Sequence, residues 1–293
     1  MLISLQHVSA GYGKPKTTEY VEILNDVSFT FPEGGRVCIA GQNGSGKTTL
    51  MRVIAGLLPY RGHVCIGETK DTLREISRMK RREVAERIAL MPQFPESYFS
   101  YTVTEAVLLG RYVHMKNRLG VASQADRETV ARTLERTGLA EIADRQIDEL
   151  SGGQLQRVML ARTLVQETPV ILLDEPSNHL DMRYQAELTE ILKAWADPDL
   201  SGNLGKPQPR TLISVFNNLW QAMDLADIAV FMREGRILAS GCPSEIMSPE
   251  LLKDVYGFDA ASYIAHTAEA WQSAVDSAAD PRILSKKDKK SST

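Results

Sequence analysis

Eight residues, Gly41-Gln-Asn-Gly-Ser-Gly-Lys-Thr48, fit the pattern GxxxxGK[ST] and follow an apolar run, Arg36–Ala40. The glycines leave consecutive backbone N–H groups able to surround an anion. A helix expected over Leu50–Leu57 adds the partial positive charge of its N-terminus. In this strand–loop–helix context the pattern predicts a nucleotide site in which Lys47 reaches the β- and γ-phosphates and Thr48 ligates Mg²⁺.

A second run, VILLDEP over Val170–Pro176, ends an apolar strand in two carboxylates. Asp174, at the strand end, is placed to hold the Mg²⁺ shell. Glu175 is placed to polarise a water that attacks the γ-phosphate, as a general base. Two acids at a strand end also fit a solvent-facing turn, but the upstream phosphate loop favours the catalytic interpretation.

A third motif, LSGGQ over Leu150–Gln154, precedes a helix expected over Gln156–Val165. Ser151 offers a hydroxyl, and Gly152 and Gly153 offer bare backbone N–H groups, as at a second phosphate-binding helix N-terminus. On its own the motif also fits a flexible hinge. The chain thus carries two phosphate-binding motifs, but only one Gly-Lys-Thr sequence and one strand-ending Asp-Glu pair to go with them. It has no internal repeat.

Apolar runs between turn residues predict the elements that position these motifs. Helices are expected over about Ala122–Gln146, with Ser123 as N-cap, and over Tyr184–Trp195. The residues from Asp197 to Pro209 predict a surface loop. Strands are expected at Leu2–His7, Val21–Leu24, Val27–Phe31, Arg36–Ala40, Val170–Leu173, Ile228–Met232 and Ile237–Ala239.

Composition narrows the class of protein. Of 293 residues, 24% are charged and the net charge is -3, so there is no basic excess of the kind that indicates nucleic-acid binding. The three cysteines, Cys38, Cys65 and Cys242, form no CxxC pair, which argues against a zinc site or a disulfide framework. No run of about 18 apolar residues predicts a membrane span.

The motifs, in this order over about residues 2–258, resemble the ATP-binding subunit of an ABC transporter. The resemblance implies an α/β fold with a P-loop NTPase core, a mixed sheet, an N-terminal antiparallel β element and a helical insertion at about residues 95–160. A C-terminal extension over 259–293 follows, with an end that we expect to be disordered. ATP and Mg²⁺ are the implied ligands.

The resemblance also assigns roles to single residues. Tyr12 stacks on adenine, and Gln93 touches Mg²⁺ and signals to the membrane subunit, which contacts residues 94–101. The implied catalytic residues are Glu175, Lys47, Gln93 and Asn217; the implied metal ligands are Thr48, Gln93 and Asp174. The implied ATP contacts are Tyr12, Gly41, Asn43, Gly44, Ser45, Gly46, Lys47, Thr48, Thr49, Ser151, Gly152, Gly153 and Gln154.

Partners follow from the same resemblance. In this family the signature of one subunit completes the ATP site of the other, which implies a second ATP-binding subunit, as a homodimer. It also implies transmembrane permease subunits, an indirect link to a substrate-binding protein, and a peripheral place on the cytoplasmic face of the membrane. Residues 94–149 are too few for the coiled coil of a DNA-repair ATPase, and one cassette does not suffice for a two-cassette translation factor.

The stretch TLISVFNNLW, Thr211–Trp220, departs from the family pattern. Asn217 stands where such subunits carry a histidine that contacts the γ-phosphate, and Asn218 stands at the following aspartate. Asn217 can donate through its amide but cannot become a cation. Since losing one preorganised group commonly costs about 10²–10³ in rate, we expect slow hydrolysis by the chain alone. A natural variant that relies on Glu175, a substitution that holds the ATP-bound state, and a binding subunit impaired in hydrolysis all stay open.

Two softer signals resemble importers of iron-siderophore, haem or cobalamin type. They are YTVTEAVLLGRY over Tyr101–Tyr112 and SPELLKDVYG over Ser248–Gly257. The resemblance favours uptake of a metal chelate, with importers of other substrates as the alternative. The transported molecule is not specified by any motif of the chain.

Overall fold

The computed structural model describes residues 1–14, 17, 19–93, 101–115, 121–178, 180–197, 209–216 and 218–278. Contacts divide the chain into two compact units, Met1–Pro243 and Ser244–Thr293. The expected end of the ATP-binding domain at residue 258 stays a prediction.

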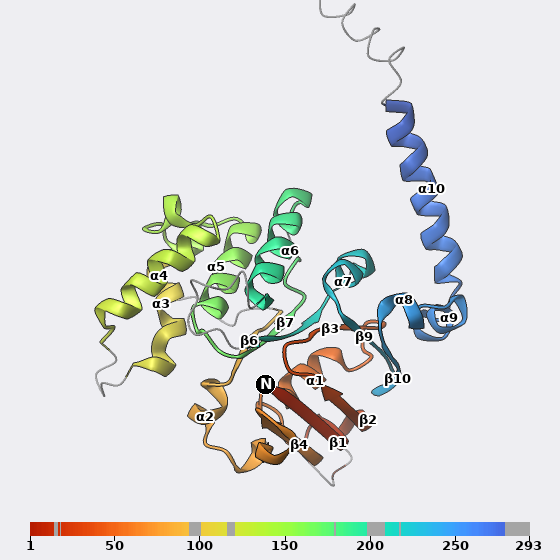
Figure 1. The fold of residues 1–293 in the computed structure, drawn as a ribbon, viewed down its shortest axis with the longest axis horizontal. Coiled ribbons are helices and arrows are strands. Elements are labelled where there is room, and N and C mark those ends of the chain that lie inside the picture. Colours follow the sequence, from red (N-terminus) through yellow and green to blue (C-terminus); the bar gives the residue numbers. More distant parts are fainter. Residues whose placement is uncertain are drawn as a thin grey trace, which may run out of the picture. The chain divides into compact units, whose positions relative to one another are not determined.

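The described part of the first unit holds a mixed six-stranded sheet (Figure 1). All neighbouring strands in it are parallel except the last pair, β9 and β10. The order across the sheet is β10 (Arg236–Gly241), β9 (Ile228–Arg233), β3 (Arg36–Ala40), β8 (Thr211–Val215), β7 (Val170–Asp174) and β6 (Ile88–Met91). The expected mixed sheet is confirmed.

A second, antiparallel sheet of four described strands confirms the N-terminal β element. Its order is β2 (Val21–Phe31), β1 (Leu2–Tyr12), β4 (Tyr60–Gly67) and β5 (Arg74–Glu75). The prediction of two separate strands before Phe31 is wrong, because Asn25 and Asp26 form a bulge rather than a turn. Asp26 adopts φ 55°, and its backbone N–H donates to Ser9 Oγ at 3.0 Å, so pairing with β1 continues on both sides.

The six-stranded sheet is buried on both faces, and residues of each central strand alternate between two cores. Val170 and Leu172 pack with α1 (Lys47–Ile54) and the antiparallel sheet. Ile171 and Leu173 pack in the other core, against the helices of the opposite face. This two-sided burial fixes the register of the strands that carry the motifs.

The other described helices of the first unit include the helical insertion. They are α2 (Arg81–Ala85), α3 (Val103–Leu108), α4 (Gln124–Arg136), α5 (Gly152–Leu164), α6 (Met182–Ala196) and α7 (Leu219–Leu225). Short 3₁₀ helices lie at Lys70–Thr72, Ile76–Arg78, Leu109–His114, Ala140–Ile142 and Ile147–Glu149. In Figure 1, α3, α4 and α5 form one group of helices, between β6 and β7 in the sequence.

Two helix predictions need correction. The helix expected to reach Gln146 ends at Arg136, because Gly138 takes φ 65° and turns the chain. The helix expected from Gln156 begins four residues earlier, at Gly152, because Ser151 acts as its N-cap. Ser123 caps α4 as predicted, accepting a hydrogen bond from Asp126 N at 3.2 Å.

Arg111, from the LGR stretch, ties the helical insertion together. Its guanidinium donates to Asp126 Oδ1 at 2.9 Å, and to the carbonyl of Val165 and Glu167 Oε2 at 2.9 and 2.7 Å. Although burial disfavours the ionised carboxylate, hydrogen bonds from Ser123 and Arg111 lower the pKa of Asp126. The softer sequence signal therefore has a structural role within the insertion.

The described part of the second unit holds short helices followed by a longer one, α8 (Pro243–Ile246), α9 (Pro249–Tyr256) and α10 (Ala260–Ala278). The first residue of α8, Pro243, is the last residue of the first unit. Ser248 caps α9 by accepting from Leu251 N at 3.1 Å, and Gly257 ends it with φ 76°. None of the helices in the described ranges combines the length and the apolar character that a membrane crossing requires.

Candidate active site

The predicted motifs meet at one edge of the mixed sheet. Because β3, β6, β7 and β8 are parallel neighbours, their carboxyl ends lie along the same edge, where ligands of α/β folds bind. Gly41 follows β3, Gln93 follows β6, Glu175 follows β7 and Asn218 follows β8. Four loops that are distant in sequence therefore converge.

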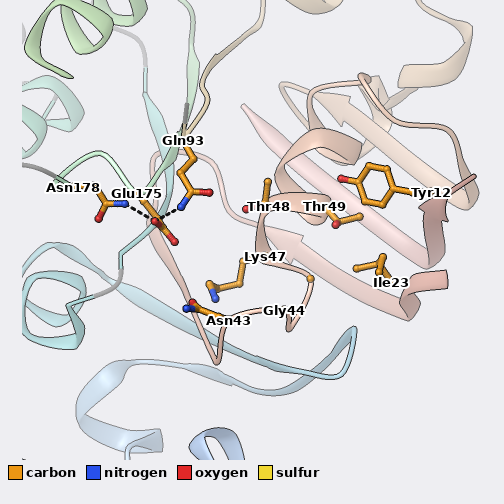
Figure 2. A pocket seen from close by; sticks show the side chains of 11 residues that line it. Tyr12, Ile23, Asn43, Gly44, Lys47, Thr48, Thr49, Gln93, Glu175 and Asn178 are labelled. Atoms are coloured by element: carbon orange, nitrogen blue, oxygen red, sulfur yellow. Dashed lines mark hydrogen bonds between the residues drawn. The ribbon is translucent and has the colours of Figure 1, made fainter. Parts of the chain in front are cut away.

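A cavity of about 520 Å³ opens at this edge (Figure 2). Figure 2 shows Tyr12 at one end and Glu175 at the other, with Thr48 and Lys47 between them. The cavity is lined by Tyr12, Ile23, Asn43, Gly44, Gly46, Lys47, Thr48, Thr49, Gln93, Glu175 and Asn178. Its two ends differ in chemistry, aromatic and apolar at one and carboxylate and amide at the other.

Glycines shape the loop before α1. A Cβ at Gly41, where φ is 150°, would lie 2.2 Å from the carbonyl oxygen of Met232 on β9. Gly44 takes φ 81°, and no atom lies within 4 Å of its would-be Cβ. The loop thus packs closely on the sheet at one glycine and faces open cavity at another, which leaves room for a phosphate against its backbone N–H groups.

Lys47 is held inside this loop. Its ammonium donates to the carbonyl oxygens of Gly41 and Gln42, at 2.8 Å each. Burial lowers the pKa of Lys47, and the nearby Glu175 and Asp174 act in the opposite direction. A partly desolvated cation beside the loop is suited to bind an anionic phosphate.

Asp174 and Thr48 fit a magnesium site. Asp174 is 2% exposed, and its Oδ1 has no hydrogen-bond partner within the part of the chain that the structure describes. Burial raises the pKa of Asp174, and a hydrogen bond with Thr48 opposes that shift. A buried carboxylate oxygen without a partner, next to a hydroxyl, is the kind of hard oxygen set that Mg²⁺ accepts.

Glu175 is held in an unusual backbone conformation. Its φ of 54° lies in the left-handed region, which non-glycine residues seldom adopt. Its Oε2 accepts hydrogen bonds from Gln93 Nε2 and Asn178 Nδ2, each at 2.5 Å (Figure 2). Two neutral amides thus orient the carboxylate without adding charge beside it.

Tyr12 forms the aromatic end of the cavity. It ends β1, is 38% exposed, and its hydroxyl accepts from Arg52 Nη1 at 3.3 Å. Ile23, from the neighbouring strand, adds apolar surface. An exposed ring beside an aliphatic side chain offers a flat surface on which a base can stack.

The LSGGQ residues form a separate helix N-terminus. Ser151 Oγ accepts from Gln154 N at 3.3 Å, and Gln154 Oε1 accepts from Ser151 N at 3.0 Å, so the two side chains cap α5 reciprocally. Ser151 and Gly152 are exposed. The described residues that line the cavity include no member of this motif.

The model of the ABC transporter family matches residues 24–178. The chain belongs to the ABC transporter family. It is 36% identical over 257 residues to the probable siderophore transport system ATP-binding protein YusV of Bacillus subtilis (strain 168), covering 88% of this chain and 86% of that protein. It is 36% identical over 254 residues to the ferric enterobactin transport ATP-binding protein FepC of Escherichia coli (strain K12), with 86% of each chain covered.

Solved ABC cassettes share the fold. A dimeric post-hydrolysis state of an ATP-binding cassette bound to ADP and Pi superposes with a TM-score of 0.69 at 23% identity, over 82% of this chain and 98% of that chain. An ATP-binding subunit of an ABC transporter gives 0.67 at 24% identity, over 84% and 92%. The resemblance inferred from the motifs and the α/β P-loop fold are both confirmed.

Within this ABC ATPase, most predicted ATP contacts line the cavity. Gly41, Ser45 and Asp174 belong to the same motifs but are not among its lining residues. Ser45 Oγ, like Asp174 Oδ1, is buried with no partner among the described residues. Asn217 and most of the expected permease contact, residues 94–100, lie outside the described residues. Asn218 caps α7, accepting from Trp220 N at 2.9 Å.

Two lining residues of the ABC site, Asn178 and Ile23, are not among the predicted ATP contacts. Asn178 lies three residues after Glu175, and its location in the turn that follows β7 was the available signal. Ile23 lies on β2, and only the packing of the antiparallel sheet beside α1 brings it to the cavity. The first follows from local spacing, whereas the second depends on tertiary packing.

Proposed function

We propose that this chain is the ATP-hydrolysing subunit of an importer that takes up a metal chelate of the iron-siderophore type through a separate membrane permease. The observation that carries the ATPase assignment is the Glu175 carboxylate, held by Gln93 and Asn178 in the same cavity as the P-loop lysine. The substrate class is supported by the siderophore and ferric enterobactin relatives. A cobalamin import ATP-binding protein of Halobacterium salinarum is 33% identical over 235 residues, and makes cobalamin the alternative chelate.

The cavity assigns each end of ATP to particular side chains. Adenine stacks on Tyr12, and the loop N–H groups and Lys47 bind the β- and γ-phosphates. Thr48 and Asp174 would hold Mg²⁺, with Gln93 beside them. When bound, Mg²⁺ supplies neutralising charge to the β- and γ-phosphate oxygens.

Hydrolysis then depends on Glu175. Its carboxylate accepts a proton from the water that attacks the γ-phosphate, so the water becomes a better nucleophile. The amides of Gln93 and Asn178 orient the carboxylate toward that water. A closed dimer would exclude bulk water from the site, and this exclusion strengthens each of these interactions.

The separate LSGGQ helix N-terminus supports a dimer of ATP-binding subunits. Its exposed amides would contact the γ-phosphate bound by the second copy, as two cassettes close on two nucleotides. We place the dimer on the cytoplasmic face of the membrane, peripheral to permease subunits that receive substrate from a binding protein. The comparisons with import subunits do not support the alternative of a binding subunit impaired in hydrolysis.

The test has an enzymatic arm and a transport arm. The purified chain should hydrolyse Mg-ATP, and Glu175→Gln should lower turnover by about a hundredfold or more, the scale of a lost general base. Membrane proteins that co-purify with the chain identify the permease. Vesicles containing that complex should then accumulate a ferric siderophore in the presence of internal ATP; accumulation of cobalamin alone would contradict the siderophore assignment.

A further inference from the structure

We propose that Gln156 is a positioning residue that fixes the backbone of Glu175, an inference that rests on the proposed ATPase function. Gln156 lies on α5, two residues after the LSGGQ motif, and is 7% exposed. Its Nε2 donates to the carbonyl oxygen of Glu175 at 3.3 Å and to that of Pro176 at 3.2 Å. The amide thus bonds to two consecutive carbonyls at the point where β7 turns.

This turn needs support because Glu175 lies in the left-handed region, with φ 54°. A non-glycine residue remains there only when its surroundings impose the conformation. The backbone N–H of Glu175 donates to the carbonyl of Val215 on β8 at 3.0 Å. On the other side, the carbonyl of Glu175 accepts from Gln156 and from the backbone N–H of Asn178, both at 3.3 Å, so the peptide groups on both sides of its Cα are fixed.

Fixing the backbone also fixes the carboxylate. The direction of the Cα–Cβ bond follows from the dihedral angles of Glu175, and its Oε2 must remain within reach of both Gln93 and Asn178. If the turn relaxed toward an ordinary conformation, the carboxylate would move away from these two amides. Misplacing a catalytic group by about 1 Å can cost on the order of a hundredfold in rate.

A purely structural role makes a different prediction. Thr163, also on α5 and 3% exposed, donates from Oγ1 to the carbonyl of Met159 at 2.8 Å. Its bond lies within the helix and does not involve Glu175. Thr163→Val therefore serves as a matched control, since it removes a buried side-chain-to-carbonyl hydrogen bond from the same helix.

The experiment compares the full chain with Gln156→Leu and Thr163→Val, measuring kcat, the KM for ATP, the unfolding midpoint and the fraction of dimer at saturating Mg-ATP. We expect Gln156→Leu to lower kcat about tenfold with KM within twofold, since the P-loop is unchanged. Because hydrolysis ends the closed state, its ATP-bound dimer should accumulate. Thr163→Val should keep kcat within twofold, even if its unfolding midpoint falls as far as that of Gln156→Leu.

Three results would overturn the positioning role. Gln156→Leu could keep the parent kcat, Thr163→Val could lose kcat equally, or Gln156→Leu could lose kcat without accumulating dimer, which would place the defect in the LSGGQ helix terminus. Failure of the proposed function gives a different result. In that case the unmodified chain would show no ATP turnover that depends on Glu175, whereas failure of the positioning role alone leaves that turnover intact.

Discussion

Gln93, which follows β6, donates from Nε2 to Oε2 of Glu175, which follows β7, although 82 residues separate them in the sequence (Figure 2). Asn178 donates to the same oxygen. The residue expected to signal to the membrane subunit thus bonds directly to the expected general base. Because this hydrogen bond is direct, a displacement of Gln93 would shift or release the Glu175 carboxylate.

Gln93→Glu should move the pH dependence of hydrolysis to higher pH. In this variant the carboxylates of residues 93 and 175 would lie within hydrogen-bond distance of each other. Because two such carboxylates resist ionising together, the pair holds a proton to higher pH than a single carboxylate would. Since the base must be unprotonated, turnover at pH 7 should fall about tenfold and recover as the pH rises. Rate measurements from pH 6 to about 9 check this. Gln93→Leu, which removes the hydrogen bond but adds no charge, should show no alkaline shift; a shared shift would contradict the explanation.

Asp174→Asn should stabilise the protein without nucleotide at neutral pH while abolishing its stabilisation by Mg-ATP. Burial raises the pKa of Asp174 above its ordinary value, so ionisation in the folded state costs stability. Below the ordinary value of about 3.9 both states are protonated, and the variant gains nothing. The gain in stability should appear as the pH rises toward the raised pKa of Asp174 and then stay constant. A gain of about 1 kcal/mol would raise the unfolding midpoint by about 2–4 °C. Calorimetry at acidic and neutral pH measures the difference in unfolding midpoint between Asp174→Asn and the unmodified chain. An equal gain at both pH values would exclude the buried charge as the cause of the gain.

Lys47→Ala and Gly153→Asp should complement each other when mixed. Each alone should lose turnover, because every site lacks either a P-loop lysine or an opposing LSGGQ helix terminus. A mixed dimer contains one site in which both are intact, so part of the turnover should return. ATPase assays of the separate and mixed proteins measure this. A mixture as inactive as its components would contradict shared sites.

Tyr12→Ala should weaken ATP binding about tenfold, since stacking of a base on an aromatic ring is worth about 1–3 kcal/mol. Tyr12→Phe keeps the ring and loses only the exposed hydrogen bond from Arg52, so its affinity should stay within about twofold. Titration with a fluorescent ATP analogue provides both values. Equal weakening in the two variants would assign the contact to the hydroxyl instead.

Asn217→His should raise turnover about tenfold or more, if position 217 holds the γ-phosphate contact inferred from the sequence. Asn218→Asp is the matched control, because aspartate preserves the N-cap of α7 and should leave turnover unchanged. The comparison uses kcat at saturating Mg-ATP. Equal rates for Asn217→His and the unmodified chain would refute the assignment of that position.

Local chemistry made much of this protein predictable from sequence. The P-loop, the capping residue Ser123 and the strand of Arg36–Ala40 depend on neighbouring residues, because glycine freedom, N-cap bonds and apolar runs act over a few positions. The limits of local reasoning appear at Asn25 and Asp26, where pairing with β1 turned an expected break into a bulge.

Tertiary structure decided which of these pieces meet. The order β3-β8-β7-β6 places the ends of distant strands side by side, and only that order brings Gln93 to Glu175. Packing of α5 against the turn after β7 then directs the Gln156 amide to the Glu175 carbonyl. Sequence spacing cannot specify such contacts, because they depend on how whole strands and helices pack, and a hydrogen bond fails once its atoms lie about an ångström too far apart.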